Sequence, residues 1–254
     1  MTTLDFTPAG GPAPLGRQLR AHSRMELNLL ARNGEQLLLT IVIPTVVLVL
    51  FATTSVADIP KPRVDFLVPG VLALAVMSTA FTGQAIATGF ERRYGVLRRL
   101  GTTPMPRHVL LLGKTAAVTA VEVAQVALLV IVGFALGWSP HGNALEVVGL
   151  LLLGTAAFSG LGLLLAGTLR AEATLAAANL IYLLLLVLGG VVFPLTDFGD
   201  GLRHVLEQLP IAALTDGLRA VLRHDDHASL HDWLVLAGWA VGSIAIASRT
   251  FRWE

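Results

Sequence analysis

Residues Phe90–Lys114 read FERRYGVLRRLGTTPMPRHVLLLGK, a segment with six cationic side chains and one carboxylate. Long apolar runs precede and follow it. A basic segment between two apolar runs is typical of a cytoplasmic loop between membrane spans, because Lys and Arg concentrate on the cytoplasmic side. The segment is too short to form a domain. Its arginines and apolar residues are more regularly patterned than orientation alone requires, so we interpret it as a docking element for a cytoplasmic partner.

The composition places the whole chain in a membrane. Of its 254 residues, 54% are apolar and only 14% are charged, whereas about 25% are charged in ordinary soluble domains. Several stretches approach the roughly 20 apolar residues that cross a bilayer as a helix. We therefore predict an all-α integral membrane protein in contact with membrane lipid. The net charge of +1 gives no reason to expect a nucleic-acid partner, and the lack of cysteine excludes disulfides and thiolate chemistry.

Six apolar segments have the length of membrane spans. The first would be about 31 Å long as a helix, which matches the hydrocarbon core of a bilayer. We predict the spans at residues 37–57, 66–90, 115–138, 147–169, 174–195 and 233–248. They belong to a single transmembrane domain, residues 17–254. Residues 1–16 lack the basic start and apolar centre of a cleavable signal, and we expect them to form a flexible leader.

The cations are divided unevenly between the two sides that six spans create. The segments on the side of both termini hold thirteen Lys and Arg residues, whereas the segments on the other side hold five. Because Lys and Arg are enriched in cytoplasmic segments, we predict that both termini and the basic loop lie in the cytoplasm.

The segment 17–33 precedes the first span and is amphipathic. As a helix it would carry three arginines on one face and three leucines on a partial apolar face (Arg17, Arg20, Arg24; Leu19, Leu27, Leu30). This pattern is typical of a helix that lies at the membrane interface, and equally of a basic anchor with no further role.

The longest outer segment, residues 196–232, contains two short amphipathic stretches on either side of Pro210. Proline interrupts a helix, so we predict two short helices. They are too short and too charged to span. They should lie at the outer surface, or enter the membrane partway where protein covers them.

Glu122 is the one charged side chain that we place within a predicted span. A carboxylate in hydrocarbon costs about 2.5 to 3.5 kcal/mol on insertion scales, so it should face protein or a wet cavity. With Thr115, Thr119 and Gln125 it forms a polar stripe along one helix face. Thr119, Glu122 and Gln125 could line a substrate path, or the stripe could join neighbouring helices by hydrogen bonds.

The tripeptide Gly113-Lys114-Thr115 is similar to the end of a phosphate-binding loop. That loop requires a glycine five positions before Gly113, where His108 stands, and no buried strand precedes it. We therefore expect no nucleotide site in this chain and interpret Lys114 as the residue that closes the inner end of the third span.

The segment HDDHASLHD, residues 224–232, holds three histidines at i, i+3 and i+7 beside three aspartates. On one helix the imidazoles would share a face that suits zinc or copper. Aspartate-rich outer loops are more often simply solvated, so we predict no metal site. Because the chain also lacks a nucleophile–base pair, paired catalytic carboxylates and a Gly-flanked serine elbow, we do not expect an enzyme.

Three segments, in this order, resemble parts of an ABC-2 type permease, the membrane subunit of an ATP-binding cassette transporter of the drug- and lipid-export kind. They are the basic loop Phe90–Lys114, GGVVFPL (Gly189–Leu195) at the end of span five, and QLPIAALTDGLRAVL (Gln208–Leu222) before span six. With the segment 17–33, the resemblance covers nearly the whole chain after residue 16.

The resemblance implies how the basic loop is used. In this family the loop forms a coupling helix that sits in a cleft of a cytoplasmic ATPase subunit. The residues so implied are Glu91, Arg92, Arg93, Tyr94, Gly95, Leu97, Arg98, Arg99 and Leu100. Arginines suit forked, charge-assisted contacts with carboxylates, while Tyr94, Leu97 and Leu100 would offer an apolar ridge. The other interpretation is that the positive charge of the loop serves only to orient the chain in the membrane.

The resemblance also implies the assembly. Two permease chains, identical or homologous, would associate with two ATPase subunits that hold the ATP and Mg²⁺, so this chain needs no cofactor. Alternating access driven by ATP would export a hydrophobic or amphipathic cargo. The predominance of Leu, Ala, Gly and Arg suggests a bacterial source, so we expect the protein in a bacterial cell (inner) membrane. Two alternatives remain: a membrane scaffold that docks a partner other than an ATPase, and an ion or proton pathway or membrane enzyme built around Glu122.

Overall fold

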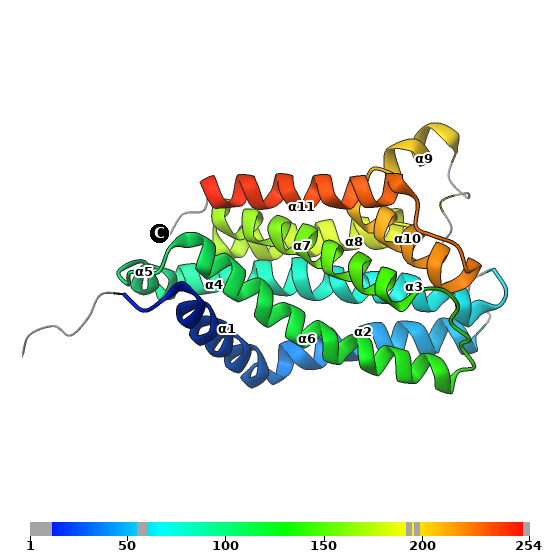
Figure 1. The fold of residues 1–254 in the computed structure, drawn as a ribbon, viewed down its shortest axis with the longest axis horizontal. Coiled ribbons are helices and arrows are strands. Elements are labelled where there is room, and N and C mark those ends of the chain that lie inside the picture. Colours follow the sequence, from blue (N-terminus) through cyan, green and yellow to red (C-terminus); the bar gives the residue numbers. More distant parts are fainter. Residues whose placement is uncertain (1–11, 55–59, 192–194, 196–198, 251–254) are drawn as a thin grey trace, which may run out of the picture.

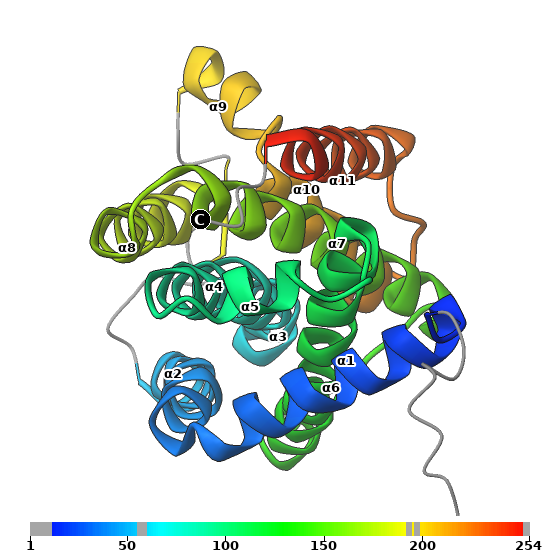
Figure 2. The ribbon, with the colours of Figure 1, turned by 90° about the vertical axis from the view of Figure 1, so that its left-hand side faces the viewer.

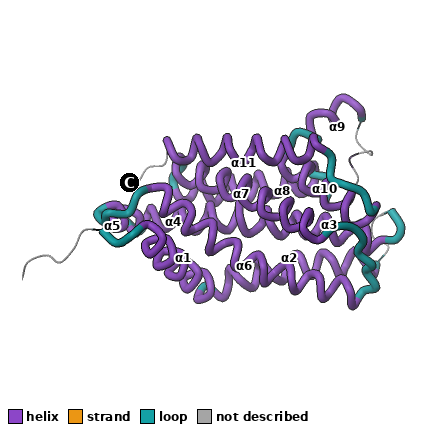
Figure 3. Tube along the Cα trace, in the orientation of Figure 1, coloured by secondary structure: helices purple, strands orange, loops and turns teal. Residues whose placement is uncertain are grey.

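The computed structural model describes residues 12–54, 60–191, 195 and 199–250. The longer regular elements within those ranges are all helices (Figure 3). In chain order they are α1 (Leu15–Arg32), α2 (Gly34–Thr53), α3 (Arg63–Val76), the π-helix η1 (Met77–Gly83), α4 (Gln84–Arg93), α5 (Val96–Gly101), α6 (Arg107–Ala135), α7 (Ala144–Thr168), α8 (Ala171–Leu188), α9 (Asp200–Leu206), α10 (Pro210–His224) and α11 (Leu230–Thr250). The predicted all-helical architecture is confirmed. Most of the predicted leader lies outside the described residues, and α1 already begins at Leu15.

Within the described part of the chain, five helical stretches are long and apolar enough to cross a membrane. They are Arg63–Arg93, Arg107–Ala135, Ala144–Thr168, Ala171–Leu188 and Leu230–Thr250. The apolar stretch Thr40–Thr53 of α2, which corresponds to the first predicted span, is shorter. The chain is therefore a multi-pass helical membrane protein, and a layout of six crossings stays a prediction.

The fifth predicted span, residues 174–195, was placed too far along the chain. Its helix, α8, begins at Ala171 and ends at Leu188. Gly189 and Gly190 follow, and Gly190 has a φ of 74°. A left-handed backbone at glycine ends a helix, which is why the apolar run continues after the helix has stopped.

The continuous helical stretch α3–η1–α4 lies at the centre of the bundle. Its sequence from Phe66 to Met77 is apolar on every face, and a helix of that kind has to be enclosed by others. It packs against α2, α6, α7, α8 and α10 (Figure 2). Phe158 of α7, which packs on this core, is fully buried.

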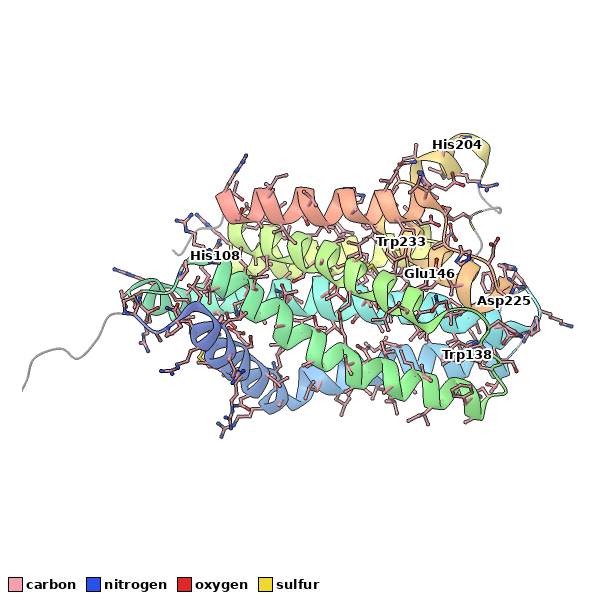
Figure 4. The ribbon with its side chains drawn as sticks, viewed as in Figure 1. His108, Trp138, Glu146, His204, Asp225 and Trp233 are labelled. Atoms are coloured by element: carbon pink, nitrogen blue, oxygen red, sulfur yellow. The ribbon has the colours of Figure 1, made fainter. Side chains whose placement is uncertain are left out.

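Both described ends of the chain lie at one end of the bundle. The start of α1, the whole of α5, the α7–α8 turn and the end of α11 share this end, which we call the α5 end (Figure 1). Helices α9 and α10 lie at the opposite end. Figure 4 shows the same division, with His108 at the α5 end and Trp138 and Asp225 at the other. The predicted placement of both termini on one side agrees with this arrangement.

The two short helices predicted before the last span are confirmed as α9 and α10. Pro210 is the first residue of α10, where its missing N–H costs nothing. α9 lies apart from the bundle (Figure 1), whereas α10 packs against α3, α7 and α11. α10 is therefore covered by other helices, which is one of the two arrangements that we predicted for this segment.

The segment 17–33 forms α1, which packs along α6. The leucines of its partial apolar face are only partly buried, and the residues that α1 buries are His22 and Glu26. Gly113 of α6 makes the close approach possible, because a Cβ there would lie 2.3 Å from Cδ2 of His22. α1 is thus attached to the bundle through a polar face that the periodicity did not identify.

Candidate functional site

The residues predicted to form one coupling helix are divided between two helices. Glu91, Arg92 and Arg93 end α4, and α5 begins at Val96. Gly95, between them, has a φ of 72°, and its N–H donates to the carbonyl of Arg92. The continuous helix predicted over this segment was therefore wrong: a glycine in the left-handed region turns the chain at Tyr94 and Gly95.

α5 is held to the bundle by its apolar residues. Leu97 is fully buried, with Leu110, Leu111 and Leu163 in the same cluster. Leu97 therefore cannot form part of an outward apolar ridge. Tyr94 remains 70% exposed.

The arginines of α5 lie on its outer side. Arg98 and Arg99 are both exposed, while the neighbouring Leu97 anchors the helix. A six-residue helix with one anchored face and two outward guanidinium groups leaves paired, forked hydrogen-bond donors exposed.

The arginines at the end of α4 make contacts inside the chain. Arg92 donates a hydrogen bond to the carbonyl of Leu169, and Arg93 pairs with Glu172. Both contacts join the central helix to the α7–α8 turn. The Arg93–Glu172 pair is exposed, so its contribution to stability is small, about 0 to 1 kcal/mol.

A buried ionic cluster lies between α1, α4 and α6. Lys114 is only 3% exposed, and its Nζ lies 2.9 Å from Oε1 of Glu26 and also donates to Glu91. Nε2 of His22 lies 3.5 Å from the same Glu26 oxygen. The cluster, defined as His22, Glu26, Glu91 and Lys114, joins α1, α4 and α6.

Sequence reasoning did not find this cluster. It treated Lys114 as the residue that closes the third span, but α6 begins at Arg107, after Pro106. Lys114 is consequently two turns inside the helix. The signal that could have revealed it is an isolated cation within the apolar run from Val109 to Val118, since a buried charge requires a partner.

His22 supplies no positive charge to the cluster at neutral pH. Burial, together with the nearby ammonium of Lys114, lowers the pKa of His22 below its usual value of 6.5. The cluster therefore contains two carboxylate side chains and one ammonium.

Two cavities adjoin this region. The first, which we call the acidic cavity, has a volume of about 500 Å³ and is lined by residues of α1, α4 and α6 that include Glu26, Glu91 and Lys114. The second, the lateral cavity, has a volume of about 510 Å³ and is lined by α2, η1 and α8. Ile86 and Phe90 line both cavities, so the two cavities are neighbours along α4.

The residues predicted to line a substrate path extend from α6 toward different helices. Oε2 of Glu122 accepts a hydrogen bond from Thr155 of α7, 2.6 Å away. Gln125 accepts from Thr79 of η1 at 2.9 Å and donates to the carbonyl of Thr40 at 2.7 Å.

Thr119 donates to the carbonyl of Thr115 in its own helix. None of Thr119, Glu122 and Gln125 lines the acidic or the lateral cavity. The contacts support the packing alternative, and the path assignment stays a prediction.

Replacement of Glu122 by glutamine separates these two interpretations. If the chain is a transport subunit, as the resemblance implies, we expect Glu122→Gln to fold and to retain at least half of the wild-type transport rate, because the amide oxygen can still accept the hydrogen bond of Thr155. Transport of a fluorescent cargo into inverted vesicles measures it. Loss of transport with unchanged yield and unfolding temperature would instead assign the carboxylate to a path.

The three histidines of residues 224–232 do not lie on one helix face. α10 ends at His224, and Asp225, with a φ of 53°, turns the chain before α11 begins at Leu230. Nδ1 of His227 lies 3.0 Å from Glu146, whereas His231 is beside Gln208. Among the described residues no group of three or more His, Asp or Glu is arranged to hold a metal ion.

Comparison with known proteins gives one family. The family described as ABC-2 type transporter matches residues 17–222, which run from α1 to the last turn of α10. No match was found among curated proteins. The matched region contains the basic loop, the ionic cluster and both cavities.

Proposed function

The chain belongs to the ABC-2 type transporter family, and we propose that it is the permease subunit of an ATP-binding cassette exporter that moves a hydrophobic or amphipathic cargo. The sequence holds no phosphate-binding loop of its own, so a separate cytoplasmic ATPase subunit, with its ATP and Mg²⁺, would supply the energy. Two permease chains, identical or homologous, would complete the unit.

The geometry of α5 is the observation that carries this proposal. Arg98 and Arg99 are exposed at the tip of the bundle, while Leu97 of the same short helix is fully buried. α5 follows directly on α4, the last part of the central helix. A partner that binds and displaces the arginines would therefore move the element around which the other helices pack.

The lateral cavity supports a cargo path on one side of the bundle. η1 lines this cavity with Ser78 and Thr82, and α8 lines it with Asn179 and Tyr182. π-helical turns are frequent at functional sites. Exposed leucines and valines flank the cavity on α2 and α8. We propose that a second permease chain covers this face and that the cargo moves between the two chains.

The division of Lys and Arg between the two ends of the bundle supports one orientation of the chain in the membrane. Twelve Lys and Arg residues of the described chain lie on segments at or near the α5 end, from α1, the basic loop, Arg170 and Arg249, against five on segments at the other end. We propose that the α5 end faces the cytoplasm of a bacterial cell, with α1 at the inner membrane interface. Since the chain has no cysteine, a single Thr102→Cys label tests this: reaction with an impermeant maleimide in intact cells would reverse the assignment.

Charge reversal on α5 tests the proposed coupling. The candidate partner is a soluble ATPase with a complete phosphate-binding loop encoded in a neighbouring reading frame. We expect Arg98→Glu/Arg99→Glu to lower ATP-driven transport at least ten-fold, because two forked contacts to carboxylates become repulsive. Transport is measured in vesicles, and co-purification of the ATPase is measured after the same vesicles are solubilised.

The matched control is Arg20→Glu/Arg24→Glu, which reverses two exposed charges on α1. This variant changes the net charge by the same amount but leaves α5 intact. It should therefore retain transport within about two-fold of the wild type. Equal transport by the two double variants would contradict docking through α5, and association with a partner that has no ATPase activity would favour the scaffold alternative.

A further inference from the structure

The acidic cavity receives a stripe of side chains from each of three helices. Helical spacing of i, i+4 and i+7 brings these side chains to one face of each helix. The members that matter here are Gln84, Thr88 and Glu91 on α4, Glu26 and Leu30 on α1, and Lys114 on α6. The cavity thus runs along α4 from an ionic end at Glu91 to a neutral polar end at Gln84, about 10 Å further along the helix.

The ionic end of the cavity holds two carboxyl groups, Glu26 and Glu91, against one ammonium, Lys114. Lys114 is bonded to both Glu26 and Glu91, and His22 stays neutral because burial lowers its pKa. Lys114 is itself enclosed, whereas the side chain of Glu91 is 18% exposed. A cation that enters the cavity can therefore approach Glu91, while an anion would meet an excess of negative charge.

Two buried polar groups on the same face of α4 have no partner. Nε2 of Gln84 and Oγ1 of Thr88 are both enclosed without a hydrogen bond, and the two residues are 4% and 1% exposed. Oε1 of Gln84 is satisfied by Ser159, so only its donor is open. An unpaired buried polar group costs about 1 to 3 kcal/mol, and a bound molecule with polar atoms would relieve that cost.

Apart from Asn33, the rest of the wall is apolar and aromatic. Phe90 and Tyr94 both line the cavity, and their rings stack with centroids 6.1 Å apart. Leu29, Leu30 and Val118 complete the apolar surface. Aromatic faces attract organic cations, and a carboxylate beside them adds a charge-assisted contact.

We propose that the acidic cavity binds an amphipathic amine, a molecule with an apolar body, one protonated nitrogen and a polar oxygen. The nitrogen lies against Glu91 and Thr88, the oxygen accepts from Nε2 of Gln84, and the apolar body contacts Phe90 and Leu30. That such amines are the transported cargo rests on the function proposed above. Binding itself does not, because it needs neither ATP nor the ATPase.

Equilibrium binding to the full chain in phosphatidylcholine nanodiscs tests the proposal. The probe is propranolol, an aryloxy amine, and the matched neutral ligand is 3-(1-naphthyloxy)-1,2-propanediol, which has a hydroxyl in place of the amine. We expect the amine to bind saturably and at least ten-fold more tightly than the diol, after subtraction of binding to empty nanodiscs.

Two variants and a control locate the site. Glu91→Gln should abolish the preference for the amine, since it removes the accessible excess charge. Thr88→Val, which keeps the shape of the side chain, should weaken amine binding several-fold. Glu172→Gln changes an exposed carboxylate at the same end, outside the cavity lining, and should leave the preference unchanged.

Two results would overturn the proposal: equal binding of amine and diol by the wild type, or an unchanged preference in Glu91→Gln. If Glu91→Gln is not recovered folded, the wild-type comparison and Thr88→Val decide the matter. Coupled transport without any preference for the amine would refute the proposed binding to the acidic cavity and leave the exporter function standing. Amine binding without coupled transport would support the acidic cavity as a binding site and contradict the exporter function.

Discussion

Lys114→Met should lower the free energy of unfolding by about 3 to 5 kcal/mol, the typical cost of removing one member of a buried ion pair. Lys114 is 3% exposed and is the ammonium partner of both Glu26 and Glu91. Without it, two carboxylates would lie close together and poorly solvated between α1, α4 and α6. Chemical denaturation in mixed micelles, followed by tryptophan fluorescence, measures the change.

Neutralisation of the carboxylates should restore the stability that Lys114→Met removes. A buried ionic cluster can be replaced by neutral residues at little cost, whereas a cluster that lacks one partner cannot. The triple variant Lys114→Met, Glu26→Gln, Glu91→Gln should therefore recover most of the loss. Lys61→Met, which removes an exposed lysine, is the control and should change stability by less than about 0.5 kcal/mol. Equal stability of Lys114→Met and this control would show that the cluster has no energetic role.

Arg219→Met should also have a large effect, because it removes the guanidinium that joins α10 to the central helix. Nη2 of Arg219 donates to the carbonyl of Val191 at 2.9 Å, and its Cζ lies 3.7 Å from the centroid of the Phe66 ring. Gly70 leaves room for this contact, since a Cβ there would lie 2.4 Å from the Val191 oxygen.

The loss expected for Arg219→Met is about 3 kcal/mol, from a hydrogen bond made by a charged group and a desolvated cation–π contact. Burial lowers the pKa of Arg219 to about 10, so the side chain is charged at neutral pH. Thermal unfolding and transport are measured together. Arg223→Met is the matched control, because Arg223 lies one turn later and its Cζ is farther from the centroid of the same ring, at 5.4 Å. A loss no larger than that of the control would contradict this role of Arg219.

Much of the helical architecture, but little of the candidate site, could be predicted from local patterns. The structure contains helices where the sequence predicted the amphipathic segment 17–33 and the two short helices around Pro210, because amphipathic periodicity and proline act within a few residues. The division of the coupling segment at Gly95 was missed, although a glycine between two arginine pairs was a visible signal. The burial of Leu97 was not visible, since it depends on Leu110 and Leu163 from two other helices.

The amino-acid sequence by itself determined that this chain is a helical membrane protein with a dense basic loop between two apolar runs. Those properties depend on hydropathy and charge counted along the chain. Only the tertiary structure decided which charges are solvated and which are enclosed. Lys114 meets one carboxylate 88 residues away and another 23 residues away. The free energy of a buried charge is set by such partners and by the water they exclude, and neither is a property of the neighbouring sequence.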